Sequence, residues 1–274
     1  MRNLALFTLL CAASARAAAP AVPETVTVRA VAWDLSWKPS TQQAFEDRVL
    51  GAVASAAKEG ADVILFPEGF AKDRSLDGVL QPIADAAGRG RLVVLGNAPH
   101  SEPGWDYVVM RAYILSGGSW QTMDKLDPTP GERARKPPAR AGMQLPLFRF
   151  RGGIVAALPA NSIEKPEIST SLKRRAIQLL LVSAPADDAA GAARVARCAA
   201  ARAVELGAAV VVASPSPASS SLHLPAQSGF DLRSPAPGAG GFRVPWKKLL
   251  ELRAENSGEA RPFLEPAPHF QVEI

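Results

Sequence analysis

A short apolar stretch that ends in a single carboxylate constrains this chain more than any other part of its sequence. Residues 61–70 have the sequence ADVILFPEGF, in which an apolar run is broken by Pro67 just before Glu68. A short continuous apolar run with β-branched residues is typical of a buried parallel strand. Ligand sites of α/β sheets lie at the carboxyl ends of such strands, so Glu68 is a candidate site residue. The alternative is an exposed loop carboxylate after a core strand, and this stretch alone leaves both open.

The rest of the chain predicts an alternation of strands and helices. Phe45, Val49, Val53 and Ala56 recur at helical spacing between a capping Ser40 or Thr41 and a closing Gly60. Further helices are expected at residues 76–87, 168–175, 187–206 and 246–254. Strands are expected at residues 25–35, 91–98, 176–184, 208–214 and 270–274, with hairpins at 106–126 and 145–158.

The chain length and the order of these elements indicate one α/β domain. The chain has 274 residues, of which 47% are hydrophobic, which is enough for one large core. The order strand-helix-strand-helix-strand, two hairpins, then helix-strand-helix-strand implies a mixed sheet system covered by helices. Residues 214–241 are rich in Ser, Pro, Gly and Ala and are expected to form a long surface excursion from this domain.

The first 17 residues have the pattern of a cleaved secretory signal. Arg2 precedes an apolar run at residues 4–13, and small residues stand at Ala15 and Ala17. The run is too short to span a bilayer, so we expect no membrane anchor. The expected location is therefore secreted or periplasmic. Cleavage after Ala17 would remove two arginines and lower the formal charge from +5 to +3, which does not argue for nucleic acid as a partner.

Cysteine and histidine usage excludes several kinds of site. The chain has two cysteines, Cys11 in the signal segment and Cys198, so the mature chain can form no internal disulfide. Cys198 lies within an Ala-rich helical stretch and is expected to be a buried filler. The three histidines have no metal-ligand spacing and no glycine-rich phosphate loop is present, so we expect neither a metal nor a cofactor.

Four segments together resemble the nitrilase, or carbon-nitrogen hydrolase, superfamily. These are LFPEG at residues 65–69, GGSWQTMDKLDPTPGE at 117–132, a Gly-led apolar strand from Gly153, and ARAVELGAAVVVAS from Ala201. The resemblance implies a four-layer αββα sandwich over residues 25–274 as a single domain. It also implies a Glu-Lys-Cys catalytic set that acts on non-peptide amide or nitrile groups.

The resemblance assigns roles to three charged residues of this chain. Glu68 is the general base, Lys125 stabilises the oxyanion, and Glu132 is the additional glutamate of the set. The family chemistry requires a carboxylate to take a thiol proton, a cation where negative charge develops, and a thiolate that attacks.

The nucleophile is missing from this pattern. Counting from Gly153 places the family's cysteine at Ala157, whereas counting back from the Pro166-Glu167 pair places it at Ala160. Either frame gives alanine, and no cysteine occurs between Cys11 and Cys198. Ser162 lies nearby but has no local base in its loop. Covalent catalysis by the family route is therefore excluded, because an alanine methyl cannot attack a carbonyl carbon.

Three functional hypotheses follow from a retained Glu-Lys set without the thiol. The first is an exported non-catalytic pseudoenzyme that binds a small amide- or carboxylate-type ligand. The second is an active hydrolase of non-peptide C–N bonds in which Glu68 activates a water molecule. The third is a scaffold or interaction protein, and the resemblance makes a homodimer plausible because the superfamily commonly associates through its helical faces.

Overall fold

Two stacked β-sheets form the centre of the molecule. The computed structural model describes residues 21–71, 74–185, 189–225, 241–256 and 269–273. Within these residues, the first sheet has the strand order β12-β1-β2-β3-β4-β5 with β6 beside β4, and the second has the order β11-β10-β9-β8-β7-β13. The strands of the first sheet are β1 (Val26–Ala30), β2 (Val63–Leu65), β3 (Leu92–His100), β4 (Val108–Ser116), β5 (Ser119–Asp124), β6 (Ala139–Arg140) and β12 (Phe242–Val244). Those of the second are β7 (Gln144–Phe150), β8 (Gly153–Pro159), β9 (Leu179–Ser183), β10 (Ala209–Ala213), β11 (Ser221–His223) and β13 (His269–Glu273).

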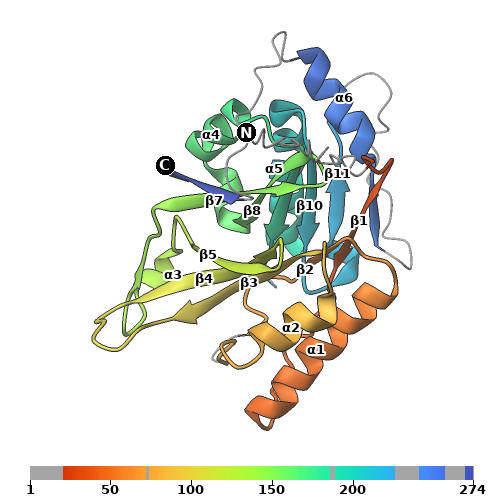
Figure 1. The fold of residues 1–274 in the computed structure, drawn as a ribbon. Helices are drawn as coiled ribbons and strands as arrows, with labels where there is room; N and C mark the ends of the chain where they lie inside the picture. The colour runs from red at the N-terminus through yellow and green to blue at the C-terminus, as the bar shows by residue number, and fades with distance from the viewer. Residues whose placement is uncertain (1–20, 72–73, 186–188, 226–240, 257–268, 274) are drawn as a thin grey trace, which may run out of the picture.

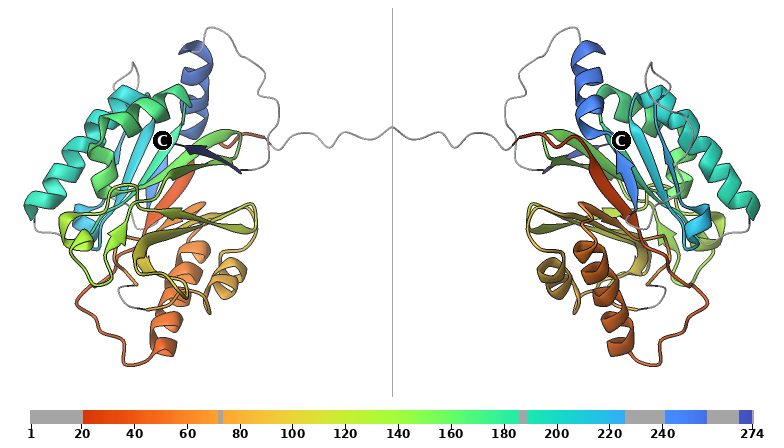
Figure 2. Two further views of the ribbon diagram at one scale, coloured as in Figure 1. Left: turned by 90° about the vertical axis from the view of Figure 1, so that its left-hand side faces the viewer. Right: turned by 90° about the vertical axis from the view of Figure 1, so that its right-hand side faces the viewer.

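Helices cover the outer faces of both sheets. Helices α1 (Gln42–Lys58) and α2 (Leu80–Ala87) pack on the first sheet, and α4 (Pro166–Arg174) and α5 (Ala189–Leu206) pack on the second (Figures 1 and 2). The short helices α3 (Pro130–Arg133), η1 (Ala160–Glu164) and η2 (Pro217–Ser219) lie in the connections, and α6 (Trp246–Asn256) follows β12. The fold is therefore the expected four-layer αββα sandwich in a single domain.

The apolar residues of the central strands divide between two cores. Val63 and Leu65 of β2 belong to the core shared by the two sheets, whereas Ile64 between them belongs to the core under α1 and α2. This division follows from the strand geometry, because successive side chains point to opposite faces. β2 is buried on both faces, which explains why its sequence is a continuous apolar run rather than an alternating one.

Helix α1 follows the expected pattern at both ends. Thr41 is its N-cap, and its side chain accepts a hydrogen bond from the Ala44 amide at 3.0 Å. Phe45 and the other three residues of the apolar face are buried. Gly60 follows the C-cap with φ +83°, which is a conformation that glycine adopts easily.

Two expected segments differ from the structure. The helix expected at residues 76–87 begins only at Leu80, which places Pro82 in the first turn, where its missing amide proton costs no hydrogen bond. The expected excursion at 214–241 begins with η2 and β11, and β11 extends the second sheet beside β10. The expected signal segment, residues 1–17, and residues 226–240 of the excursion lie outside the described residues. No helix in the described part of the chain is long and apolar enough to span a membrane.

Candidate active site

The loop that carries Glu68 is held between the two sheets. Just after β2, the Phe66 amide donates to the Val94 carbonyl of β3, and the Phe66 carbonyl accepts from the Ser183 hydroxyl of β9, both at 2.9 Å. The Glu68 amide donates to the Ala184 carbonyl at 3.0 Å. Hydrogen bonds to both sheets therefore fix the Glu68 loop at the edge where the sheets meet. Glu68 is only 5% exposed.

A glycine in β3 permits this loop to lie close to the sheet. An ideal Cβ at Gly96 would be 2.1 Å from the Pro67 carbonyl oxygen, which is far inside van der Waals contact. Gly69, with φ +75°, turns the chain immediately after Glu68, and its amide donates to the Asn97 carbonyl at 3.1 Å. The position of Glu68 thus depends on residues of β3 as well as on its own strand.

Lys125 follows β5 and points its ammonium group at Glu68. Its backbone amide donates to the Met110 carbonyl at 2.8 Å, and its carbonyl accepts from the Gly142 amide at 2.9 Å. The Lys125 Nζ lies 2.6 Å from Oε1 of Glu68. Because the Lys125 side chain is 2% exposed and that of Glu68 is 7% exposed, this is a buried, charge-assisted pair.

Glu132 completes a three-residue ionic cluster. Its Oε1 accepts from Lys125 Nζ at 3.0 Å, and its Oε2 accepts from the Thr129 amide at 2.6 Å. The Thr129 hydroxyl in turn accepts from the Glu132 amide, which makes a capping box at the start of α3. The cap holds the Glu132 carboxylate in place. The Thr-x-x-Glu spacing is a known sequence signature of this cap, so this local contact can be predicted from the sequence.

The cluster keeps Lys125 charged. Burial lowers the pKa of Lys125, but the carboxylates of Glu68 and Glu132 outweigh that effect, so its pKa is raised overall. The ammonium group has three N–H donors, of which two serve the glutamates in the described part of the chain. One donor is therefore available for an acceptor oxygen of a ligand.

The strand register shows where the two alanines, Ala157 and Ala160, lie relative to the end of β8. Ala157 lies inside β8 opposite Leu181, and Pro159 at the end of β8 lies opposite Ser183. Ala184, which follows Ser183, is the residue that binds the Glu68 amide. Ala160 therefore comes directly after the end of β8, just as Ala184 comes directly after the end of β9, whereas Ala157 lies within β8.

The segment that begins at Ala160 also contacts the Lys125 loop. The Asn161 side-chain amide donates to the Asp127 carbonyl, and Lys165 Nζ lies 3.0 Å from an Asp127 carboxylate oxygen. These contacts tie η1 and the start of α4 to the loop between Lys125 and Glu132. The four elements that carry Glu68, Lys125, Glu132 and Ala160 therefore meet at one edge.

Three buried polar atoms around this edge have no hydrogen-bond partner among the described residues. They are Oδ1 of Asn97, Oδ1 of Asn161 and Oγ of Ser162. Asn97 and Ser162 are at most 1% exposed, and Asn97 shares the Met110 carbonyl with the Lys125 amide. Buried polar groups nearly always bind protein, water or ligand. Neither Asn97 nor Asn161 lies in a recognisable motif, so the sequence alone did not point to these two residues.

Cys198, His100 and His223 lie outside the ionic cluster. Cys198 is half-buried on α5 and packs against the apolar core. His100 lies 3.3 Å from the Tyr113 hydroxyl, and His223 lies 2.9 Å from the Ser221 hydroxyl. Burial lowers the pKa of His223, which keeps it neutral at pH 7. The described residues contain no group of three acidic, His or Cys side chains that could hold a metal.

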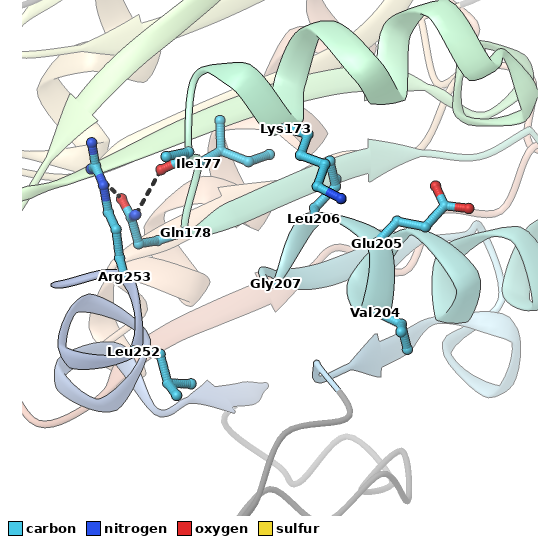
Figure 3. Close-up of a pocket in the computed structure, with 10 residues that line it drawn as sticks. Lys173, Ile177, Gln178, Val204, Glu205, Leu206, Gly207, Leu252 and Arg253 are labelled. Carbon is cyan, nitrogen blue, oxygen red and sulfur yellow. Dashed lines mark hydrogen bonds between the residues drawn. The ribbon is translucent and has the colours of Figure 1, made fainter. Parts of the chain in front are cut away.

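A separate cavity of about 380 Å³ lies between α4, α5 and α6. In Figure 3, the Arg253 guanidinium of α6 reaches the Gln178 side chain, at 3.5 Å. Gln178 also accepts from the Ile154 amide at the start of β8 and donates to the Ala176 carbonyl. Its polar groups are thus occupied in joining β8, β9 and α6, and none of the cluster residues lines this cavity.

Solved structures with the same fold include an amidase and a yeast protein of the nitrilase superfamily. An amidase from Nesterenkonia sp. is 21% identical, with a TM-score of 0.60, 85% of this chain covered and 94% of that chain. Saccharomyces cerevisiae Nit3, described as a member of branch 10 of the nitrilase superfamily, is 16% identical, with a TM-score of 0.64 and coverages of 89% and 97%. A cysteine-to-alanine mutant of the Nesterenkonia amidase in complex with butyramide is 22% identical, with a TM-score of 0.59 and coverages of 85% and 95%.

The sequence comparisons give the family directly. A search of curated protein sequences found no match. The family model for carbon-nitrogen hydrolases matches residues 25–225, which is most of the chain and includes all three charged residues of the cluster and both alanine positions. This chain therefore belongs to the carbon-nitrogen hydrolase family.

Proposed function

We propose that this protein is a non-catalytic member of its family that binds a small primary amide beside Glu68 and Lys125, with Ala160 at the position of the missing nucleophile. The observation that carries the proposal is the buried Lys125–Glu68 contact of 2.6 Å on an edge whose strands and loops contain no cysteine. In a well-studied hydrolase, deleting the nucleophile lowers turnover by a factor on the order of 10⁶. Binding does not need that group.

The charge of the cluster favours a neutral ligand over a carboxylate. One lysine faces two glutamates, so the cluster has a formal charge of −1 when both carboxylates are ionised. A ligand carboxylate would add a further negative charge in a poorly solvated place, which is unfavourable. An amide can instead accept from the third Lys125 donor through its carbonyl oxygen, and it adds no charge.

The partnerless polar atoms support the same ligand. Oδ1 of Asn97 and Oδ1 of Asn161 are acceptors, and Oγ of Ser162 can accept or donate. The –NH₂ group of a primary amide offers two donors, which a carboxylate lacks. A purely structural role for the Glu-Lys pair would leave these three atoms unexplained, although it would account for the retention of the pair itself.

The alanine mutant of the Nesterenkonia amidase adds an independent argument. That protein is in complex with butyramide although its cysteine has been replaced by alanine. Binding of an amide in this fold therefore does not require the thiol in that protein. We extend this reasoning to the present chain, in which alanine stands at both positions, 157 and 160, where the family resemblance places the cysteine.

Calorimetry with matched ligands tests the proposal. Purified protein lacking residues 1–17 is titrated with butyramide and with butyrate, and ammonia release is measured in parallel. We expect heat of binding from the amide, weaker or no binding of the carboxylate, and no ammonia. If no amide of a broad panel gives heat of binding, only the scaffold hypothesis remains. Ammonia release that disappears in Glu68→Gln would instead support hydrolysis by a Glu68-activated water.

Two cysteine substitutions test the position of the missing group. We expect Ala160→Cys to react with iodoacetamide and to gain amide turnover, because residue 160 directly follows β8 just as Ala184, which binds the Glu68 amide, directly follows β9. Ala157→Cys is the matched control, since residue 157 lies within β8 and is similarly buried, at 2% exposed against 3% for Ala160. Equal reactivity of both variants, or turnover in Ala157→Cys alone, would contradict the assignment of residue 160.

The location and assembly of the protein are also proposals. Its signal-like start supports export with cleavage after Ala17, and N-terminal sequencing of protein from the envelope fraction would test this. Family resemblance supports a homodimer, which sedimentation velocity would distinguish from a monomer. An uncleaved N-terminus in the cytoplasm, or a sedimentation coefficient of a monomer at micromolar concentration, would contradict the respective proposal.

A further inference from the structure

A second cavity, of about 430 Å³, lies on the outer side of the first sheet. Its walls come from the β1–α1 connection, the first turns of α1 and the loop that follows Glu68. We call it the aromatic pocket, and its defining residues are Trp33, Trp37, Lys38, Phe45, Phe70 and Arg74. Its volume is within the range of pockets that bind small molecules, about 300–1,000 Å³.

Four aromatic rings form the apolar wall of the aromatic pocket. The Trp33 ring centroid lies 6.1 Å from that of Trp37, 6.3 Å from that of Phe45 and 5.6 Å from that of Phe70, in edge-to-face arrangements. Trp33, Phe45 and Phe70 are at most 3% exposed, and Trp37 is half-buried. The three buried rings therefore form the inner part of the wall, and Trp37 forms its outer part.

A guanidinium group holds Trp37 against the rest of the wall. The Arg48 Cζ lies 4.7 Å from the Trp33 ring centroid and 4.2 Å from that of Trp37. Both distances are within the range of cation–π attraction. Arg48 comes from α1, so the position of Trp37 is coupled to the helix and does not depend on the loop alone.

The charge around the pocket is positive. Lys38 and Arg74 are the charged residues among those that line it, and Arg74 is fixed by a 2.7 Å hydrogen bond to the Pro39 carbonyl. Helix α1 begins beside them and has no acidic residue in its first turn, so its N-terminal dipole adds to this field. Two acidic residues nearby, Asp34 and Glu46, bind Ser36 and Gln42 and do not line the pocket.

We propose that the aromatic pocket binds a small carboxylic acid that carries an aromatic group. The aromatic group would pack against the four rings, and the carboxylate would face Lys38 and Arg74. The positive lining makes a cationic ligand unfavourable, although aromatic walls by themselves would attract one. This site is separate from the Glu68–Lys125 cluster and does not rest on the function proposed for it.

Tryptophan fluorescence and calorimetry with three related probes test the charge preference. The probes are 3-phenylpropionate, its neutral amide and 2-phenylethylammonium. We expect the carboxylate to bind at least about tenfold more tightly than the amide, which corresponds to about 1.4 kcal/mol, and the ammonium compound not to bind. Equal binding of carboxylate and amide would overturn the proposal.

Variants then locate the site. Arg74→Gln and Lys38→Gln should each weaken binding of the carboxylate several-fold. The control is Arg89→Gln, which replaces an exposed arginine just after the C-terminal end of α2 and outside the pocket lining, and it should leave the affinity unchanged. Trp37→Ala should weaken binding about tenfold or more, and Trp37→Phe should retain part of it if the alanine variant folds poorly. Unchanged affinity in both Trp37 variants would overturn the proposal.

Glu68→Gln separates this site from the ionic cluster. We expect the variant to bind 3-phenylpropionate with unchanged affinity while its binding of butyramide changes. A loss of 3-phenylpropionate affinity in Glu68→Gln, with no effect of Arg74→Gln, would place the carboxylate at the cluster and overturn the proposal.

Discussion

Replacing Lys125 by methionine should strongly destabilise the protein. Methionine fills much of the same space but has no charge. It therefore removes the ammonium group whose Nζ lies 2.6 Å from a Glu68 carboxylate oxygen and 3.0 Å from a Glu132 carboxylate oxygen. The side chains of the two glutamates are 7% and 15% exposed, so water cannot replace the lost partner fully. Removing one partner of a buried ion pair typically costs about 3–5 kcal/mol.

That cost is large compared with the total stability of a domain, which is about 5–15 kcal/mol. For a domain of this size each kcal/mol shifts Tm by about 2–4 °C, so the Lys125→Met variant should melt roughly 6–20 °C below the wild type. Urea unfolding, monitored by circular dichroism, measures the free energy of unfolding directly. The slope of this free energy against urea concentration, the m-value, is held equal for the two proteins in the fit.

The control variant combines Lys125→Met with Glu68→Gln and Glu132→Gln. It removes all three charges together, so no unpaired buried charge remains and most of the lost stability should return. A loss below about 1 kcal/mol for the single variant, or a triple variant that is no more stable, would refute the reasoning.

The wild-type protein should show no pH dependence from Lys125 near neutrality. The pKa of Lys125 is raised in the folded state, since its carboxylate partners outweigh the effect of burial. Its contribution to stability is therefore fully present below the unfolded-state pKa of about 10.4 and is lost only as pH rises through the folded value. A decline in stability between about pH 7 and 9 that Lys125→Met lacks would contradict this sign.

Two further substitutions test how the cluster is positioned. Thr129→Ala removes the cap that holds Glu132, so the free energy of unfolding in urea should fall by about 0.5–2 kcal/mol and butyramide should bind more weakly. Unchanged butyramide binding would mean that the cap does not position the Glu132 carboxylate. Gly96→Ala should lower the free energy of unfolding by about 1–3 kcal/mol and reduce amide binding, because the new Cβ would collide with the Pro67 carbonyl. The control is Gly51→Ala in α1, where the Cβ would meet open space, and it should stabilise the protein by about 0.4–1 kcal/mol. Similar effects of the two glycine substitutions would contradict the close approach of Pro67.

The sequence by itself determined the nature and order of the elements and the chemistry available to them. Continuous apolar runs and period-3.6 apolar patterns act over a few residues, so they predicted the buried strand before Glu68 and the buried face of α1. The absence of cysteine between residues 12 and 197 is a fact of composition and needed no structure. The position of Pro82 was not used to place the start of α2, although proline is tolerated in a helix only in the first turn. The predicted start at residue 76 was therefore wrong by four residues.

Only the tertiary structure decided which side chains meet. Glu68 and Lys125 are separated by 57 positions in the chain. Their contact depends on the strand order of the first sheet, which places β3 and β4 between β2 and β5, and on how the Pro67 loop fits over Gly96. Our proposal of residue 160 rather than 157 likewise rests on the register of β8 against β9, because counting along the sequence cannot detect extra residues in a strand. The aromatic pocket arises in the same way, since its rings come from three separate segments that local patterns do not connect.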